Sequence, residues 1–205
     1  MKQIILLSIL FISNMLTAQD LIGTPTGLII VYNYEDAHFY LQLQGTDKQK
    51  TGQENVFLID NQLVQVKTLN KYKFCKNTKP ELSFNDFIAT YVDWEKSFQE
   101  EQFSTPIHSK LEFSKTNNGR DFGLWIYDMP VVSKAITTDT TRTTPVKKQM
   151  FVLTRVKDYL VGINCPLLET DNSETIKSYL ITNIGGIVES DKEINVEELN
   201  KQVNK

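Results

Sequence analysis

The feature that most constrains the fold is a strand–turn–strand pattern that recurs along this 205-residue chain. In its clearest instance Phe39, Leu41 and Leu43 alternate with more polar neighbours, which is typical of a strand with one buried face. The predicted strand pairs are 28–34 with 39–44, 56–59 with 63–69, 110–115 with 122–129, and 150–156 with 159–165. Short turns, such as the one at Asp60-Asn61, join the members of each pair, so the sequence predicts antiparallel pairing.

Two predicted helices are long enough to cover such a sheet. The first, over 83–102, begins with Ser83 as its N-cap and has Asp86 three residues on. The second begins near Asp171, which we expect to cap it, and ends at Gly185. An apolar stripe on the first helix is expected to be core rather than a ligand site. The stripe consists of Phe84, Phe87, Ile88, Tyr91, Trp94 and Phe98.

Hairpins covered by two main helices predict an α+β fold with an antiparallel sheet. We expect one domain over 19–190, followed by a tail, 191–205, that contains a short helix. A separate N-terminal β unit over 27–69 stays open as an alternative. Pro166 is expected to end the last strand, and the threonine-rich segment 130–149 is expected to be a long exposed loop.

The N-terminal residues 1–18 have the pattern of a cleavable signal peptide. Lys2 is followed by the apolar stretch 4–12, and Leu16-Thr17-Ala18 precedes the polar Gln19. The apolar stretch is too short to span a bilayer, which takes about 20 residues. We therefore expect a periplasmic or secreted protein with no membrane insertion after cleavage, and an uncleaved N-terminal anchor is the alternative.

Charge and motifs argue against several classes of function. The formal net charge is −3, and the arginines Arg120, Arg142 and Arg155 do not cluster with the lysines, which disfavours nucleic-acid binding. No phosphate-binding loop, nucleophile elbow or zinc-protease motif occurs. His38 and His108 have no second metal ligand at a suitable spacing. The sequence predicts no catalytic residue, no metal site and no cofactor.

The two cysteines, Cys75 and Cys165, are a candidate disulfide because an exported protein matures in an oxidising compartment. The bridge would close a loop of about 90 residues and stabilise the chain by roughly 4–5 kcal/mol. The alternative is a pair of buried free thiols that behave as small apolar side chains.

Tyrosine and tryptophan side chains are the candidate binding residues. Tyr32, Tyr34 and Tyr40 lie on the first predicted hairpin, and Trp125 and Tyr127 lie on the strand 122–129. Such side chains bury a large area and keep a polar group for recognition. The alternative is that they stabilise the sheet as cross-strand pairs. The loop segment 135–147 is a further candidate for partner binding.

The second half of the chain resembles the Mog1/PsbP-like fold in the order of its elements. The resemblance covers 83–188, which includes KLEFSKTNNGRDFGLWIYDMP, FVLTRVKDYLVGINCPL and the two predicted helices. It implies a curved antiparallel sheet sandwiched by helices. It also implies an accessory or binding protein without catalytic residues.

We therefore expect an exported, non-enzymatic binding or accessory protein whose partner is a protein or a small apolar ligand. The alternative is an extracytoplasmic hydrolase whose catalytic residues come from distant positions, with His38, His108 and the scattered carboxylates as the candidate groups. Asp121 and Asp128 do not support that alternative as a pair, because seven residues of strand separate them by about 23 Å.

Overall fold

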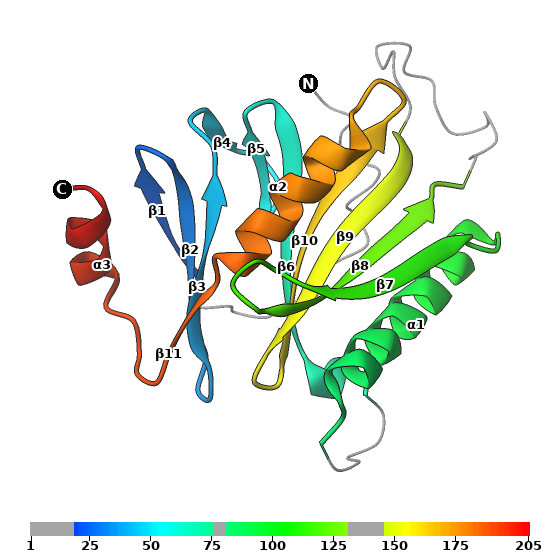
Figure 1. Ribbon diagram of the computed structural model, residues 1–205, viewed down its shortest axis with the longest axis horizontal. Coiled ribbons are helices and arrows are strands. Elements are labelled where there is room, and N and C mark those ends of the chain that lie inside the picture. Colours follow the sequence, from blue (N-terminus) through cyan, green and yellow to red (C-terminus); the bar gives the residue numbers. More distant parts are fainter. Residues whose placement is uncertain (1–18, 76–80, 131–145) are drawn as a thin grey trace.

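The structure of the chain is a computed structural model, and it describes residues 19–75, 81–130 and 146–205. Within these residues the strands form two antiparallel sheets, of four and seven strands, in the orders β1-β2-β3-β11 and β4-β5-β6-β10-β9-β8-β7 (Figure 1). The strands are β1 (Gln19–Thr24), β2 (Gly27–Asn33), β3 (His38–Gln44), β4 (Lys48–Lys50), β5 (Val56–Ile59), β6 (Gln62–Asn70), β7 (Ser109–Lys115), β8 (Asp121–Asp128), β9 (Val146–Val156), β10 (Tyr159–Leu168) and β11 (Val188–Ser190).

Helices cover both faces of the seven-stranded sheet. Helix α1 (Phe84–Phe103) lies on one face, and α2 (Ser173–Gly185) lies on the other, where it also contacts β3 (Figure 1). The short helix α3 (Val196–Val203) packs on the outer face of the four-stranded sheet, and a 3-10 turn (Lys71–Lys73) follows β6. This arrangement confirms the predicted α+β class with two main helices.

The layers enclose three apolar cores. The inter-sheet core lies between the two sheets and α2, the α1 core lies between the seven-stranded sheet and α1, and the outer core lies between the four-stranded sheet and α3. Their main members are, in that order, Tyr32, Phe39, Leu41 and Ile163; Phe87, Tyr91, Trp125 and Phe151; and Ile22, Ile29, Val31 and Leu199.

The four predicted hairpins are present. In β3 the alternating residues Phe39, Leu41 and Leu43 are completely buried in the inter-sheet core, as their period of two predicts. Asp60 and Asn61 both adopt positive φ, of 46° and 64°, as the tight turn between β5 and β6 requires.

Strand β8 is buried on both faces, as its doubly apolar sequence predicts. Phe122 and Leu124 point into the inter-sheet core, whereas Trp125 and Tyr127 point into the α1 core. The strand lies next to the edge strand β7, and α1 approaches it closely at Gly123. A Cβ atom there would lie 2.8 Å from Cγ2 of Ile88.

Helix α1 begins as predicted, but its buried stripe differs from the prediction. The Ser83 hydroxyl accepts a hydrogen bond from the Asp86 backbone N–H at 3.2 Å and donates one to the Asp86 carboxylate at 2.6 Å. Along the helix the buried face continues through Glu95 and Gln99, whereas Trp94 stays only half-buried. In the second half of the helix, polar side chains are therefore buried in place of the aromatic side chains that the sequence predicts there.

Three short strands were absent from the prediction. Strand β1 directly precedes the turn that Pro25 and Gly27 indicate, β4 lies in the polar segment 45–53, and β11 follows α2. Strands β4 and β11 are three residues long, too short to show an alternating pattern. Backbone pairing with a longer neighbour holds them in place.

Two predicted boundaries are wrong. Strand β10 continues through Pro166, which pairs in register with Gln149 of β9. The proline fits because β6 pairs with β10 only as far as Asn164, so no strand requires its missing N–H. The N-cap of α2 is Asn172 rather than Asp171, whose carboxylate instead accepts from the Leu168 backbone N–H at 2.7 Å.

Strands from the two halves of the chain share the larger sheet. Strand β6 pairs with β10, so the predicted segment 27–69 contributes β2 and β3 to one sheet and β4, β5 and β6 to the other. The predicted loop 130–149 is shorter, because β9 begins at Val146. Most of that loop and the predicted signal peptide 1–18 lie outside the described residues.

The candidate disulfide between Cys75 and Cys165 is wrong, because both cysteines are free thiols. The Cys165 side chain points into the inter-sheet core, whereas Cys75 packs at the α1 core, on the opposite face of the larger sheet. Burial raises the pKa of both thiols and keeps them protonated. Cys165 is fully buried and Cys75 is only half-buried.

We expect a thiol reagent to label one cysteine of the folded protein, Cys75, and to label Cys165 only after unfolding. Mass spectrometry of the labelled, unreduced protein checks this by peptide mapping. A Cys75→Ser variant should then show no labelling under native conditions. A mass two hydrogens below that of the dithiol would contradict the structure.

The close approach of α1 to β8 predicts that Gly123→Ala destabilises the fold by about 1–3 kcal/mol, because the new methyl group overlaps the Ile88 side chain. Gly52→Ala is the matched control, since nothing lies within 4 Å of a Cβ atom at that exposed position. Urea unfolding of both variants measures the difference. Equal midpoints would show that α1 is not packed as described.

Candidate functional site

The predicted aromatic binding residues do not form one site. Tyr32 and Tyr34 belong to the inter-sheet core, Trp125 and Tyr127 belong to the α1 core, and Tyr40 packs against the outer core. The structure therefore distributes the five residues over three separate layers.

Stacking accounts for Tyr32 of β2 and for Tyr34, which directly follows that strand. The Tyr34 ring stacks on that of Tyr159 with centroids 4.2 Å apart, and the Tyr32 ring stacks on that of Phe39 at 4.9 Å. The Tyr34 and Thr68 hydroxyl oxygens are 2.6 Å apart. Burial raises the pKa of Tyr34 to about 12, so the hydroxyl stays protonated. These contacts are those of packed strands, the alternative interpretation of the tyrosines.

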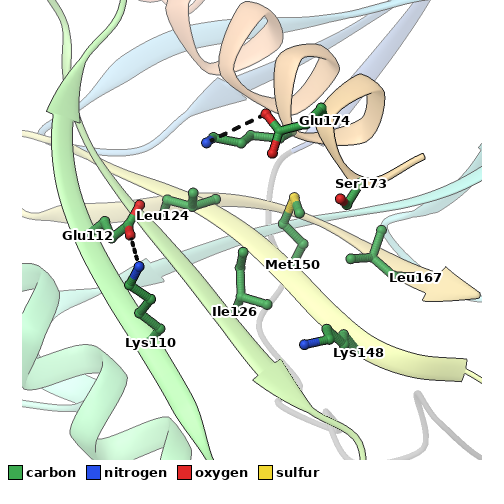
Figure 2. A pocket seen from close by; sticks show the side chains of 10 residues that line it. Lys110, Glu112, Leu124, Ile126, Lys148, Met150, Leu167, Ser173 and Glu174 are labelled. Atoms are coloured by element: carbon green, nitrogen blue, oxygen red, sulfur yellow. Dashed lines mark ion pairs between the residues drawn. The ribbon is translucent and has the colours of Figure 1, made fainter. Parts of the chain in front are cut away.

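A groove with an apolar floor lies on the face of the larger sheet that α2 covers in part. We call it the β7–α2 groove, because Lys110 and Glu112 of β7 form one wall and the first turns of α2 form the other (Figure 2). Its volume is about 280 Å³. The floor consists of Leu124, Ile126, Met150 and Leu167 from β8, β9 and β10.

Each lysine that lines the groove has a carboxylate partner. Lys110 forms an ion pair with Glu112, and hydrogen bonding to that lysine lowers the pKa of Glu112. On α2, Lys177 lies 3.8 Å from the Glu174 carboxylate, and at the open end Lys148 lies 3.0 Å from the carboxylate of Asp128. Charge of both signs therefore surrounds the apolar floor (Figure 2).

The β7–β8 turn fixes the two walls of the groove relative to each other at one end. The Asn118 side-chain amide donates to the Gly185 carbonyl at 2.7 Å, and so satisfies a free carbonyl at the end of α2. Arg120 donates to the Ile187 carbonyl at 3.0 Å and forms an ion pair with Glu189 at 2.9 Å. These bonds make the spacing between β7 and α2 a fixed property of the fold.

The groove is not predicted by any pattern in the sequence. Leu124 and Ile126 lie on the predicted strand 122–129, and nothing local shows that α2 leaves Ile126 half-exposed. The signal in the sequence is that this strand has apolar side chains on both faces. The side chains that form the walls come from elements more than 50 residues apart, so only the register of the sheet brings them together.

The histidines do not form a catalytic arrangement in the described part of the chain. His108 is exposed, and Nδ1 of the half-buried His38 is buried without a hydrogen-bond partner. Neither forms an ion pair with a described carboxylate, and the described residues contain no group of ligands suited to a metal ion. Asp121 and Asp128 pair with Lys115 and Lys148. These residues give the hydrolase alternative no assembled site.

A second polar cluster is buried beneath α1. The Glu95 carboxylate, with 2% of its side chain exposed, lies 2.8 Å from the Lys67 ammonium group of β6, which is 15% exposed. Its oxygens also accept hydrogen bonds from the Tyr91 hydroxyl at 3.2 Å and the Gln99 amide at 2.9 Å. The ammonium group also lies 5.7 Å from the centre of the Trp94 ring.

This cluster is better suited to fixing α1 than to chemistry. Burial lowers the pKa of Lys67, and the adjacent Glu95 carboxylate opposes that change by favouring the charged ammonium form. Both oxygens of Glu95 already accept bonds from protein donors, and the carboxylate is buried, so the protein itself uses most of its acceptor capacity. The pair links the middle of α1 to β6 across the α1 core.

We expect Lys67→Met to lower the free energy of unfolding by about 3–5 kcal/mol, because it leaves the Glu95 carboxylate buried without its cation. Adding Glu95→Leu should restore most of that loss. Breaking the exposed Lys115–Asp121 pair by Lys115→Met is the control and should cost under about 1 kcal/mol. Urea unfolding measures all three, and a loss from Lys67→Met as small as the control's would contradict a buried pair.

The described residues contain no helix with both the length and the apolar character needed to cross a membrane. No model of a protein family matches the chain, and no curated protein is similar to it. Among solved structures, it is similar to the solution structure of cyanobacterial PsbP (CyanoP) from Synechocystis sp. PCC 6803. The match has 13% identity and a TM-score of 0.46, and covers 81% of this chain and 94% of that one.

Proposed function

We propose that this protein is an exported, non-enzymatic binding protein that holds a segment of a protein partner in the β7–α2 groove. The groove itself carries the proposal: between walls whose spacing is fixed, its apolar floor leaves Ile126 half-exposed, and Leu124, Met150 and Leu167 are buried beside it. Apolar surface with a polar rim is the usual composition of a protein interface.

The form of the groove favours a protein partner over a small apolar ligand. Small ligands bind in pockets that bury most of their surface and that are lined mainly by apolar side chains. Here the floor is open on one side, and charged groups of Lys110, Lys148 and Glu174 surround it. One or two apolar side chains of a partner would fill the floor while its polar groups meet the rim.

Export is the second part of the proposal. The signal-like pattern of 1–18 supports it, and cleavage after Ala18 would leave β1, which begins at Gln19, complete. In β1 Gln19 pairs with Tyr32, so the new N-terminus would lie at the edge of the smaller sheet.

A photoreactive amino acid at position 148, at the open end of the groove, should form one defined protein adduct in cells that make this protein. We expect Ile126→Asn to reduce that adduct about tenfold, which corresponds to losing one buried aliphatic contact of about 1.5 kcal/mol. The matched control is Ile194→Asn, a half-buried isoleucine that packs at the outer core. The labelled protein should come from the extracytoplasmic fraction and begin near Gln19.

A photoreactive group at the exposed Lys201 of α3 controls for proximity alone. An adduct that forms equally at 148 and 201, or that survives Ile126→Asn, overturns the groove as the binding surface. A bound small molecule in the native mass spectrum, with no protein adduct, overturns the protein partner in favour of the small ligand. An intact Met1 in the cytoplasmic fraction overturns export.

A further inference from the structure

Strand β7 is the outermost strand of the larger sheet, beside the groove. It pairs with β8 on one side, and no described strand pairs with its other side. Its seven residues are exposed apart from the half-buried Leu111. An edge of this kind presents a row of backbone donors and acceptors to an incoming strand.

The register identifies which backbone groups face outward. Thr116 N–H donates to the Arg120 carbonyl at 2.9 Å, and Asp128 N–H donates to the His108 carbonyl at 3.1 Å. Bonding alternates along an antiparallel strand, so the even-numbered residues of β7 bond to β8. The N–H and C=O groups of Ser109, Leu111, Phe113 and Lys115 therefore point away from the sheet, and no described group bonds to them.

The other sheet edges in the described part of the chain have fewer unpaired backbone groups. Strands β4 and β11 are three residues long. Strand β1 has six residues, but its Gly23 carbonyl already accepts a hydrogen bond from the Asn204 side chain at 3.0 Å. Strand β7 thus presents the longest row of open backbone groups.

An exposed aromatic ring lies on the same edge. Phe113 is 39% exposed, and its ring lies over Gly123 of β8, with Cε1 3.5 Å from where a Cβ atom would be. Its other ring neighbour is Phe84 at the start of α1, with centroids 6.3 Å apart. A strand added to β7 would cover the exposed part of Phe113.

The side chains of β7 restrict what such a strand contains. Lys110, Glu112 and Lys115 are all exposed and carry charges of alternating sign, and Leu111 and Phe113 lie between them on the α1 face. Opposite charges in directly facing positions stabilise a strand pair, and like charges destabilise it. The complementary strand is acidic, basic and acidic at the three charged positions and apolar at the two between.

We propose that β7 takes up an extended segment of the protein partner as an additional antiparallel strand of the larger sheet. The inference rests on the proposed function, because Lys110 and Glu112 also form a wall of the β7–α2 groove. Main-chain hydrogen bonds to Leu111 and Phe113 supply the binding, and the charged positions set the register. From its N-terminus, the partner segment is acidic opposite Lys115, then polar and apolar, basic opposite Glu112, then apolar, and acidic opposite Lys110.

The probe is the blocked peptide Glu-Thr-Val-Lys-Val-Glu, added to the mature protein. Amide hydrogen exchange by NMR should slow about tenfold at Leu111 and Phe113, whereas Lys110 and Glu112, already bonded to β8, should not change. The charge-reversed peptide Lys-Thr-Val-Glu-Val-Lys should protect the same amides much less. Unchanged exchange at Leu111 and Phe113, or equal protection by both peptides, overturns the inference.

Two variants at one position isolate the backbone donor. Phe113→Pro removes an N–H that bonds to nothing in the described structure, so the fold should tolerate it, while the added strand loses a hydrogen bond. Phe113→Val loses the same ring but keeps the N–H. We expect the proline variant to abolish the peptide effect at Leu111 and the valine variant to retain it, with thermal unfolding confirming that both are folded.

The same variants separate this inference from the proposed function. If the adduct at position 148 forms equally with Phe113→Pro and Phe113→Val, the groove binds a partner without strand addition, and the inference is wrong. If β7 amides of the free protein become protected as its own concentration rises, a second copy occupies the edge, which also overturns it. Loss of the adduct with the proline variant alone supports both.

Discussion

The whole arrangement depends on how much of the seven-stranded sheet two helices can cover. Helix α1 has 20 residues and is about 30 Å long, whereas α2 has 13 residues and is about 20 Å long. The shorter helix lies over β9 and β10 and shares its face of the sheet with the four-stranded sheet. Strand β8 is apolar on both faces, so the part that α2 does not reach, around Ile126, becomes the floor of the β7–α2 groove.

On the other face of the larger sheet, a buried ion pair fixes the position of α1. Burying the Lys67–Glu95 pair costs desolvation energy that the ion pair and its hydrogen bonds offset, so the pair contributes little net stability compared with apolar residues of the same shape. It does favour one position of α1 on the sheet, because a shift of the helix by one residue would move Glu95 away from Lys67. The position of α1 also supports Phe84 against Phe113, and so affects the edge strand.

The local elements could be predicted from the sequence, and the surfaces could not. The alternating strand β3 and the predicted apolar face of α1 follow from periods of two and 3.6 residues, and the cap at Ser83 follows from its hydroxyl group before the first turn. The three-residue strand β11 carries no period, and Glu95 occupies a helical position whose burial is visible only once β6 supplies Lys67. The groove could not be predicted for the same reason, since only the register of the sheet brings its walls together.

The β7 edge and the β7–α2 groove lie together because both belong to the part of the larger sheet that α2 does not cover. An exposed edge with an aromatic ring invites pairing between copies, and charge on the strand limits it. In an antiparallel self-pair centred on Glu112, two carboxylates would face each other, which disfavours that register. A heterologous strand of complementary charge meets no such repulsion. The charges that disfavour this self-pairing register are thus the ones that would select a partner, and the nearby apolar floor gives that partner a place for its anchoring side chains.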